Sequence, residues 1–290
     1  MIMICGQMPP DLLYQPLRSK GIAIYRRIMV LFAGLQRYSI IQANLERSKA
    51  ENGRDKTDKK LVNTGELNLI FHSSLVKRLL DGSFIVYLFD KLYNRLPPTL
   101  QCQIYLLKNN LIKEAKIFTH LTNAEKISLH KLAKQLNFNS VSVEIGSYLG
   151  ASSCFLANSI KKNNGILYCI DTWKNQTMPE GERDTYTEFL KNTGKYKDII
   201  ILIRGWSSVS VNQLKTRTDK IDFLFIDGDH SYEGCKTDWD YYSPLLKKKS
   251  IVVFHDTGWS EGVNKLISES VITVADKILE LPNMRAFRIN

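Results

Sequence analysis

Five short runs of β-branched and apolar residues in the second half of the chain constrain its fold most strongly. A longer segment with the composition of a helix follows each of the first four runs. The runs lie at 141–145, 166–170, 199–203, 221–226 and 251–254, and the helix-compatible segments lie near 151–162, 184–192, 207–215 and 236–247. Strands that alternate with helices in this way predict βαβ units, and therefore a parallel sheet with helices on both faces.

The last part of the chain adds a change of strand direction. A short helix is expected near 262–269, and strands are expected near 271–274 and 284–289. The chain between these two strands is too short for a helical crossover, so they are expected to pair antiparallel. The predicted fold class is α/β: a Rossmann-like, doubly wound, mostly parallel sheet of seven strands with a C-terminal antiparallel hairpin, preceded by a helical N-terminal extension.

The pattern divides the chain into three parts. Residues 1–64 are interpreted as a basic helical extension that ends in a charged linker. Residues 65–119 are interpreted as a helical segment that packs on or caps the catalytic domain, which is placed at 120–290. Thr122 and Glu125 have the spacing of a capping box, which predicts that a helix begins there and runs to about residue 136.

The positive charge lies mainly upstream of the predicted catalytic domain. Residues 1–110 carry 16 Lys and Arg against 8 Asp and Glu, in a chain of 290 residues with a formal net charge of +11. This charge has two interpretations, a solvated face or a peripheral contact with an anionic membrane. The start of the chain lacks the pattern of a signal peptide, and its apolar runs are too short to span a bilayer. The five cysteines form no CxxC pair, which argues against a zinc ribbon or a disulfide scaffold and favours a cytoplasmic location.

The loop after the first predicted strand has the composition of an anion-binding turn. Gly146 and Gly150 allow the backbone to turn sharply and to approach a ligand closely, and the helix that follows offers free N–H groups to an anion. A dinucleotide fingerprint would need glycine where this chain has Tyr148. A smaller anion, such as an amino-acid carboxylate, is therefore favoured over a pyrophosphate. The alternative is a strand–helix turn with a structural role alone.

The ends of the second and third strands carry groups that suit a nucleoside. Asp171 ends the second strand, where a carboxylate can accept hydrogen bonds from both hydroxyls of a ribose. Trp206 and Ser207 follow the third strand and can cover an adenine with an aromatic ring and a hydroxyl. Taken singly, Asp171 can be a helix cap and Trp206 a core residue. Together, at successive strand ends, they predict a nucleoside site.

The fourth and fifth strands end in acidic and imidazole groups. Asp227 and Asp256 end neighbouring strands and can share a hard divalent ion such as Mg²⁺, with His255 or Thr257 completing the protein ligands. His230 is the candidate general base that deprotonates an acceptor. Two alternatives stay open: the aspartates only cap turns, or a protonated histidine balances their charge without a metal.

Residues from about 120 to 270 resemble the class I S-adenosylmethionine-dependent methyltransferases. The resemblance rests on the motifs EIGSYxGxSS, IDTW and FIDGDHSYEG…FHDT, whose subfamily is similar to macrocin-type and catechol-type O-methyltransferases. It implies cofactor contacts by Glu144, Gly146, Ser147, Tyr148, Gly150, Ser152, Asp171, Trp173, Trp206, Ser207 and Asp227. It also implies aspartate metal ligands at Asp227 and Asp256, and a catalytic base at His230.

The chain departs from the resembled pattern at two places. At 247–250 it has KKKS, where such proteins usually have a glycine turn before the fifth strand. Beside the second metal position it has His255 and Thr257, where the resembled proteins place Glu before, or Asn after, the shared aspartate Asp256.

These observations predict O-methylation of a small hydroxylated metabolite, a sugar or a phenol, with S-adenosylmethionine as methyl donor and Mg²⁺ as a candidate cofactor. The alternatives are a metal-independent N-methyltransferase and a catalytically silent module that binds S-adenosylmethionine. A nucleic-acid partner is not expected, because the excess positive charge lies upstream of the catalytic domain. Assembly into a homo-oligomer stays open.

Overall fold

The computed structural model describes residues 91–176 and 181–290. All of them belong to the second of the two units into which the chain divides, Asp81–Asn290. The expected basic extension and linker at 1–64 lie outside the described residues, as do residues 65–90 of the expected helical segment.

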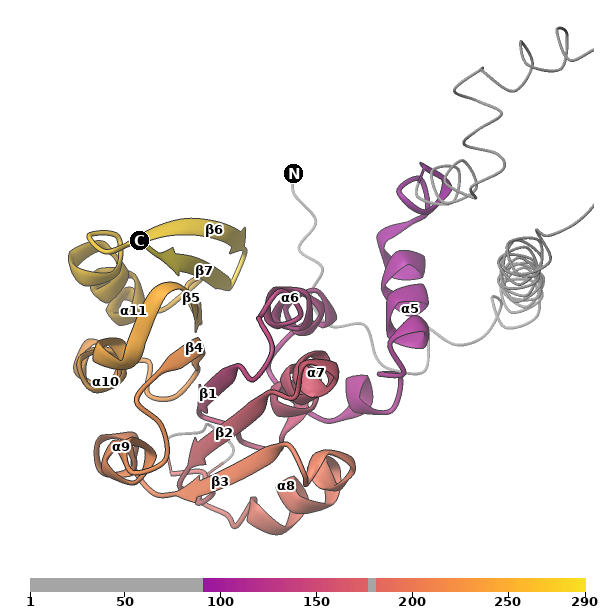
Figure 1. The fold of residues 1–290 in the computed structure, drawn as a ribbon. Helices are drawn as coiled ribbons and strands as arrows, with labels where there is room; N and C mark the ends of the chain where they lie inside the picture. Colours follow the sequence, from indigo (N-terminus) through magenta and orange to yellow (C-terminus); the bar gives the residue numbers. More distant parts are fainter. Residues whose placement is uncertain (1–90, 177–180) are drawn as a thin grey trace, which may run out of the picture. The chain divides into compact units, whose positions relative to one another are not determined.

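One sheet of seven strands forms the centre of the described part (Figure 1). Its order is β3-β2-β1-β4-β5-β7-β6, and neighbouring strands from β3 to β5 pair in parallel. The parallel strands are β1 (Val141–Ile145), β2 (Ile166–Asp171), β3 (Ile200–Arg204), β4 (Ile221–Ile226) and β5 (Leu246–His255). This arrangement confirms the predicted Rossmann-like, mostly parallel sheet of seven strands.

The last two strands form the expected antiparallel hairpin. β6 (Ala275–Leu281) pairs with β7 (Met284–Ile289), and β7 also pairs antiparallel with β5. β7 lies where the sequence predicted it, whereas the prediction of a strand at 271–274 was wrong. The reason is that a π-helical turn, Ile267–Val271, extends the preceding helix, so the chain becomes extended later than its β-branched residues suggest.

Helices cover both faces of the sheet (Figure 1). They are α6 (Asn123–Ala133), α7 (Ala151–Ile160) and α8 (Tyr186–Thr193) on one face, and α9 (Ser207–Lys215), α10 (Tyr232–Tyr242) and α11 (Glu261–Leu266) on the other. The alternation of side chains along β4 shows how one strand serves both faces. Leu224 belongs to the apolar cluster beneath α9, α10 and α11, whereas Phe223 and Phe225 belong to the cluster beneath α6, α7 and α8.

The segment between β4 and β5 differs from its sequence prediction. α10 begins before the expected 236–247, because the hydroxyl of Ser231 accepts a hydrogen bond from the Gly234 N–H and caps the helix there. β5 then includes the KKKS segment. Lys249 adopts a left-handed φ of +72°, the conformation that a glycine turn would supply, and the Ser250 hydroxyl accepts from the Lys247 N–H at 3.0 Å.

The helices before β1 pack against the domain that contains the sheet. Thr122 and Glu125 form the predicted capping box at the start of α6. α5 (Pro98–Lys108) and the loop after it contribute Leu106 and Leu111 to an apolar cluster with Phe155 of α7. This segment therefore adds to the core of the domain that begins with α6, while the domain boundary at residue 120 stays a prediction.

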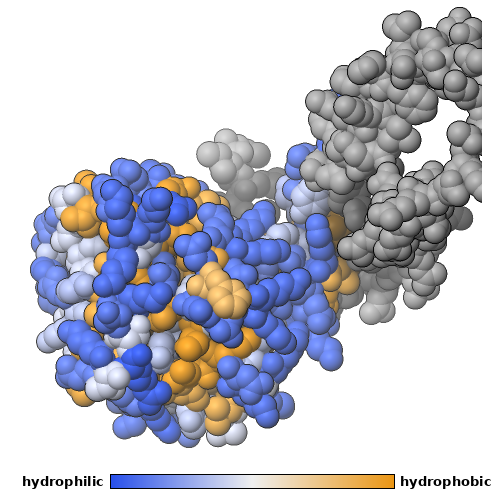
Figure 2. All heavy atoms as spheres, in the orientation of Figure 1, coloured by the Kyte–Doolittle hydropathy of each residue, from blue (hydrophilic) through white to orange (hydrophobic). Residues whose placement is uncertain are grey.

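The surface of the described part is mainly hydrophilic. Figure 2 shows blue, hydrophilic residues over most of the visible face, with apolar residues in separate patches. Phe118, Trp206 and Trp259 are among the large apolar side chains that are more than half exposed. None of the helices in the described ranges has both the length and the apolarity that a bilayer-crossing segment needs.

Candidate functional site

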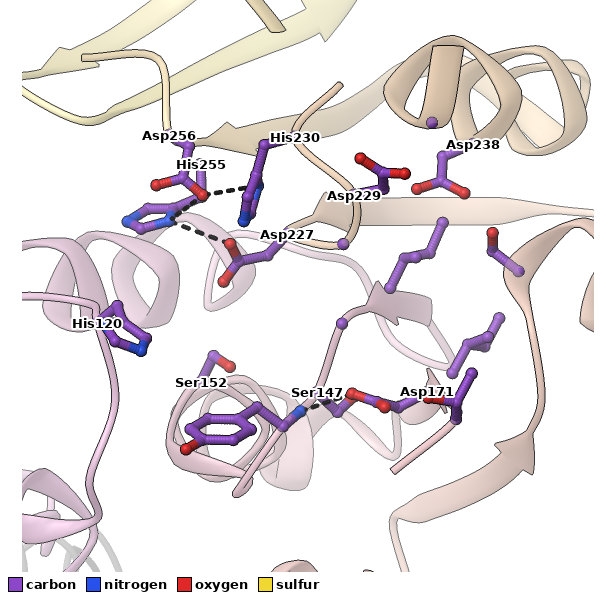
Figure 3. A pocket seen from close by; sticks show the side chains of 18 of the residues that line it. His120, Ser147, Ser152, Asp171, Asp227, Asp229, His230, Asp238, His255 and Asp256 are labelled. Carbon is purple, nitrogen blue, oxygen red and sulfur yellow. Dashed lines mark hydrogen bonds and ion pairs between the residues drawn. The ribbon is translucent and has the colours of Figure 1, made fainter. Parts of the chain in front are cut away.

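A pocket of about 660 Å³ lies at the carboxyl ends of the parallel strands, where ligands bind in open α/β sheets. Its wall contains most of the predicted site residues: Gly146, Ser147, Tyr148, Ser152, Asp171, Trp206, Ser207, Asp227, His230, His255 and Asp256. The other three predicted residues, Glu144, Gly150 and Trp173, are not part of the wall. Figure 3 shows that the pocket extends from Asp171 and Asp238 to a cluster around His255.

Protein packing explains both glycines of the loop after β1. Gly146 and Gly150 have positive φ angles of +86° and +84°. A Cβ on Gly146 would lie 2.0 Å from the carbonyl oxygen of Asp227, and one on Gly150 would lie 2.5 Å from the side chain of Thr193. Without a side chain, the loop can pass beside the end of β4 and α7 can begin against α8. Both glycines therefore have a packing role, and Gly146 in addition lines the pocket.

Glu144 and Trp173 are core residues in this structure. Glu144 is fully buried, accepts a hydrogen bond from the Ser153 hydroxyl, and its Oε2 lies 3.4 Å from the Cys169 thiol. Burial raises the pKa of its carboxyl, although neighbouring serine hydroxyls offset part of the effect. Trp173 is fully buried and its Nε1 donates to the carbonyl of Tyr148 at 3.1 Å. Trp173 is thus bonded to a residue of the pocket wall, whereas Glu144 is bonded to the first turn of α7.

Asp171 joins the two loops at the ends of β1 and β2. Its carboxylate accepts hydrogen bonds from the backbone N–H groups of Tyr148 at 2.8 Å and Trp173 at 2.6 Å. Burial raises the pKa of Asp171, and these backbone hydrogen bonds act in the opposite direction without cancelling the shift. Asp171 thus supports the turn, as the capping alternative proposed, while it also lines the pocket.

Trp206 and Ser207 mark the start of α9 at the edge of the pocket. Trp206 is the N-cap residue and is 55% exposed, which excludes a role as a core residue. The carbonyl of Ser207 accepts a hydrogen bond from the Tyr242 hydroxyl at 2.8 Å, so α10 fixes the start of α9. An aromatic ring and a hydroxyl are therefore held side by side in the wall.

His255 lies between the two aspartates that were predicted as metal ligands. Its Nδ1 is 3.0 Å from Oδ1 of Asp227 and 3.3 Å from Oδ2 of Asp256. Each of the three residues offers one potential ligand atom, and these three atoms all lie within 4.8 Å of one another. Burial lowers the pKa of His255, but the neighbouring carboxylates outweigh it and raise the pKa to about 12. The two carboxylates therefore favour the protonated form of His255, which lies between them (Figure 3).

His230 is paired with Asp256 on the other side of the same cluster. Its Nδ1 lies 2.9 Å from Oδ2 of Asp256. Burial lowers the pKa of His230, but the hydrogen bond and charge of Asp256 outweigh it, so the pKa lies above its ordinary value. The same two histidines hold the pKa of Asp256 well below its usual range. Asp256 thus orients His230 through Nδ1 and leaves its Nε2 available to accept a proton.

The remaining hydrogen bonds of Asp256 come from residues that the sequence analysis did not single out. Its Oδ1 accepts from Trp259 Nε1 at 2.7 Å and from Asn283 Nδ2 at 3.1 Å. Glu125, predicted as part of a capping box, also lies 3.8 Å from Nε2 of His255. Trp259 lies three residues after Asp256, a spacing that could have indicated it, whereas the capping-box pattern of Glu125 gave no sign of its place near His255. Asn283 lies in the β6–β7 turn, and no motif connects it with the site.

Comparison with known proteins shows that part of this chain is similar to a methyltransferase domain. Residues 143–257 match a family profile described as a methyltransferase domain. A curated relative, the uncharacterized protein y4gI of Sinorhizobium fredii, is 26% identical over 119 residues, which cover 40% of this chain. The matched region spans only 13% of that relative's length.

Solved structures share the fold of the described part. The O-methyltransferase NovP superposes with a TM-score of 0.51 at 12% identity, covering 63% of this chain and 88% of NovP. The TDP-rhamnose 3'-O-methyltransferase CalS11 gives a TM-score of 0.47 at 20% identity, covering 69% of this chain and 90% of CalS11. At these identities the similarity establishes the fold, and the NovP match carries that conclusion.

Proposed function

We propose that this chain is an S-adenosylmethionine-dependent O-methyltransferase that acts on a small hydroxylated acceptor, a sugar or a phenol, with His230 as the general base. The observation that carries the proposal is the 2.9 Å pair between His230 and Asp256 in the pocket wall. This pair lies at the strand ends of a segment that matches a methyltransferase domain. A base oriented beside a nucleoside-sized pocket is what methyl transfer to a hydroxyl requires.

The pocket wall offers groups for each part of the cofactor. Asp171 suits the ribose hydroxyls, and Trp206 and Ser207 suit the adenine. The loop residues Ser147 and Tyr148 lead to the start of α7, where Ser152 also lines the pocket. The first N–H groups of a helix have no intrahelical acceptor and attract an anion, so the start of α7 suits the carboxylate of the methionine part.

His230 supplies the proton chemistry of the transfer. When bound, S-adenosylmethionine supplies a methyl group on a positively charged sulfur. The Nδ1–H of neutral His230 donates to Asp256, and the free Nε2 takes the proton of the acceptor hydroxyl as that oxygen bonds to the methyl group. The electron pair of the broken carbon–sulfur bond returns to the sulfur. The protein contributes alignment and proton removal, because the methyl group is already electrophilic.

Exposed aromatic side chains line the pocket at His230 and at the loop after β1. Trp259 is 63% exposed, and its ring contacts His230 edge to face with the ring centroids 5.3 Å apart. Phe118, also exposed, makes an edge contact with the ring of Tyr148. Exposed aromatic faces beside a base suit the flat face of a phenol or the apolar face of a sugar ring.

The hydrogen-bonded arrangement of the cluster favours transfer without a metal. Asp256 already accepts from four donors, and His255 supplies positive charge between the two carboxylates. Asp227, His255 and Asp256 would hold a divalent ion if these hydrogen bonds were given up, and such an ion would polarise an acceptor oxygen. The imidazole nitrogen in this set suits Mn²⁺ or Zn²⁺ better than Mg²⁺.

The proposal is tested by incubating the full-length chain with S-adenosylmethionine and panels of phenols, sugars and amines. The expected result is release of S-adenosylhomocysteine with a hydroxylated acceptor, and a mass spectrum of that acceptor showing one added methyl group. Transfer to amines alone supports the N-methyltransferase alternative. Binding of S-adenosylmethionine without transfer to any class supports the silent binding module instead.

A further inference from the structure

The wall of the pocket contains a buried carboxyl group that the proposed reaction does not use. Asp238 of α10 is 3% exposed and lines the pocket at the end opposite to the His255 cluster (Figure 3). A Cβ added to Gly228 would lie 3.3 Å from Oδ2 of Asp238, so the carboxyl is close to this glycine. Asp238 therefore sits beneath the loop after β4, next to the start of α9.

The described part of the protein places few hydrogen-bond donors or positive charges near Asp238 to replace the water that burial removes. The Ser207 side chain lies near enough to lower the pKa of this carboxyl in part, while Asp229 adds a like charge. Within the described residues, the ion pairs formed by lysine, arginine and histidine do not include Asp238. Burial is the main cause that raises the pKa of Asp238 to about 7. A carboxyl group in this environment gains from any additional donor that a ligand brings.

The position of Asp238 indicates which part of a ligand would bring that donor. If Asp171 holds a ribose, the base of the nucleoside extends toward Trp206 and Ser207, and Asp238 lies beside Ser207. An adenine presents an exocyclic 6-amino group at its far edge, and this group donates hydrogen bonds. A purine with a 6-oxo group presents an acceptor at the same point, which a carboxylate repels.

We propose that Asp238 is a specificity-determining residue that accepts a hydrogen bond from the 6-amino group of the cofactor's adenine and rejects 6-oxo purines. The inference rests on the proposed cofactor site. A site that hydrogen-bonds one ligand group rejects the analogue lacking it, because the buried partner is then left without a donor. Ser207 lines the same part of the pocket as Asp238.

The test compares the affinities of S-adenosylhomocysteine and S-inosylhomocysteine for the full-length chain by calorimetry at pH 8. The wild-type protein is expected to bind the adenosyl ligand at least about 10-fold more tightly, the order of one hydrogen bond to a charged group. In Asp238→Asn the amide can accept from a 6-amino group or donate to a 6-oxo group, so the preference is expected to fall to about threefold or less. Asp240→Asn is the matched control, because Asp240 lies on the same helix, is exposed and pairs with Lys236.

The outcomes separate this inference from the proposed function. If the wild-type protein binds S-adenosylhomocysteine tightly but binds the inosyl ligand equally well, the role of Asp238 is overturned while the proposed function stands. This comparison needs no variant. A preference that persists in Asp238→Asn also overturns this role. A wild-type protein that binds neither ligand overturns the proposed function, and the inference with it. Loss of preference in Asp238→Asn but not in Asp240→Asn supports the inference.

Discussion

At the scale of single residues, the proposed proton transfer depends on the pair of His230 and Asp256. Asp256 is held by the four donors His230, His255, Trp259 and Asn283, all of which belong to the protein. The charge on Asp256 stabilises the protonated form of His230, whereas a general base must be neutral. The pairing therefore fixes the orientation of the imidazole, and it also leaves less of the neutral base at low pH.

His230→Ala is expected to lower the turnover number by about 10²–10⁴-fold, the range for lost general-base catalysis. The affinity for S-adenosylmethionine is expected to stay nearly unchanged, because His230 faces the acceptor side of the pocket. Turnover and calorimetric affinity are measured on the same preparation. A variant with near wild-type turnover would show that His230 has a structural role only.

The pH dependence of turnover follows from the pKa of His230. Because Asp256 raises this pKa above its ordinary value, the neutral base forms only at higher pH, and turnover is expected to rise through a midpoint above about 6.5. Asp256→Asn removes the charge that stabilises the imidazolium, so the midpoint is expected to move to lower pH while the maximal rate falls. A pH–rate profile of both proteins measures this, and an unchanged midpoint in the variant would contradict the pairing.

The balance of charge around His255 predicts how the enzyme responds to chelation. Since His255 supplies the positive charge between Asp227 and Asp256, turnover is expected to be unchanged after exhaustive EDTA treatment. Added Mn²⁺ or Mg²⁺ is then expected to have little effect. Loss of turnover that Mn²⁺ restores would show instead that these residues hold a catalytic metal, and it would leave the methyltransferase proposal intact.

At the scale of elements, the ends of β1 and β4 can pack closely because Gly146 has no side chain. The carbonyl of Asp227 occupies the place where a Cβ would stand. The pocket therefore depends on a backbone contact between two strands that are far apart in the sequence. The loop carrying Ser147 and Tyr148 is placed by the same contact.

Gly146→Ala is expected to destabilise the protein by roughly 3 kcal/mol or more, because it combines a clash with the Asp227 backbone and an unfavourable φ. Gly181→Ala is a matched control. Gly181 has a similar φ of +84° but nothing within 4 Å of the added Cβ, so the cost is expected to be about 1 kcal/mol. Urea denaturation measures both values, and equal costs would show that backbone conformation, not packing, explains Gly146.

At the scale of the whole molecule, the helices before β1 belong to the packing of the catalytic domain. Leu106 and Leu111 cover Phe155, and Glu114 forms a 2.6 Å ion pair with Lys195. These contacts predict where the chain can be shortened. A shortened chain that keeps these contacts must begin upstream of α5, whereas the domain was predicted to begin at residue 120.

A chain that begins at residue 65 is expected to fold and to bind S-adenosylmethionine as the full-length chain does. A chain that begins at residue 117 lacks Leu106 and Leu111 and is expected to unfold at lower temperature, because Phe155 loses its apolar cover. Thermal denaturation and calorimetry compare the three proteins. If the chain from residue 65 failed to fold, the boundary would cut a shared core.

The sequence by itself determined the sheet and the strand ends that carry polar groups. Alternation of β-branched runs with helical segments is a local signal, and parallel strands bring their carboxyl ends to one edge of the sheet. For this reason Asp171, Trp206, Asp227, His230 and Asp256 could all be assigned to one pocket. The capping box of α6 is local in the same sense, since both of its residues lie within one helical turn.

Only the tertiary structure decided which side chains meet within that pocket. Asn283 reaches Asp256 because β7 inserts beside β5, and no spacing in the sequence encodes that approach. Glu144 and Trp173 match a motif, yet they are buried because the elements around them enclose them. Asp238 enters the wall because α10 packs beside α9. A motif records which groups are available, whereas contacts between distant elements depend on the packing of the complete fold.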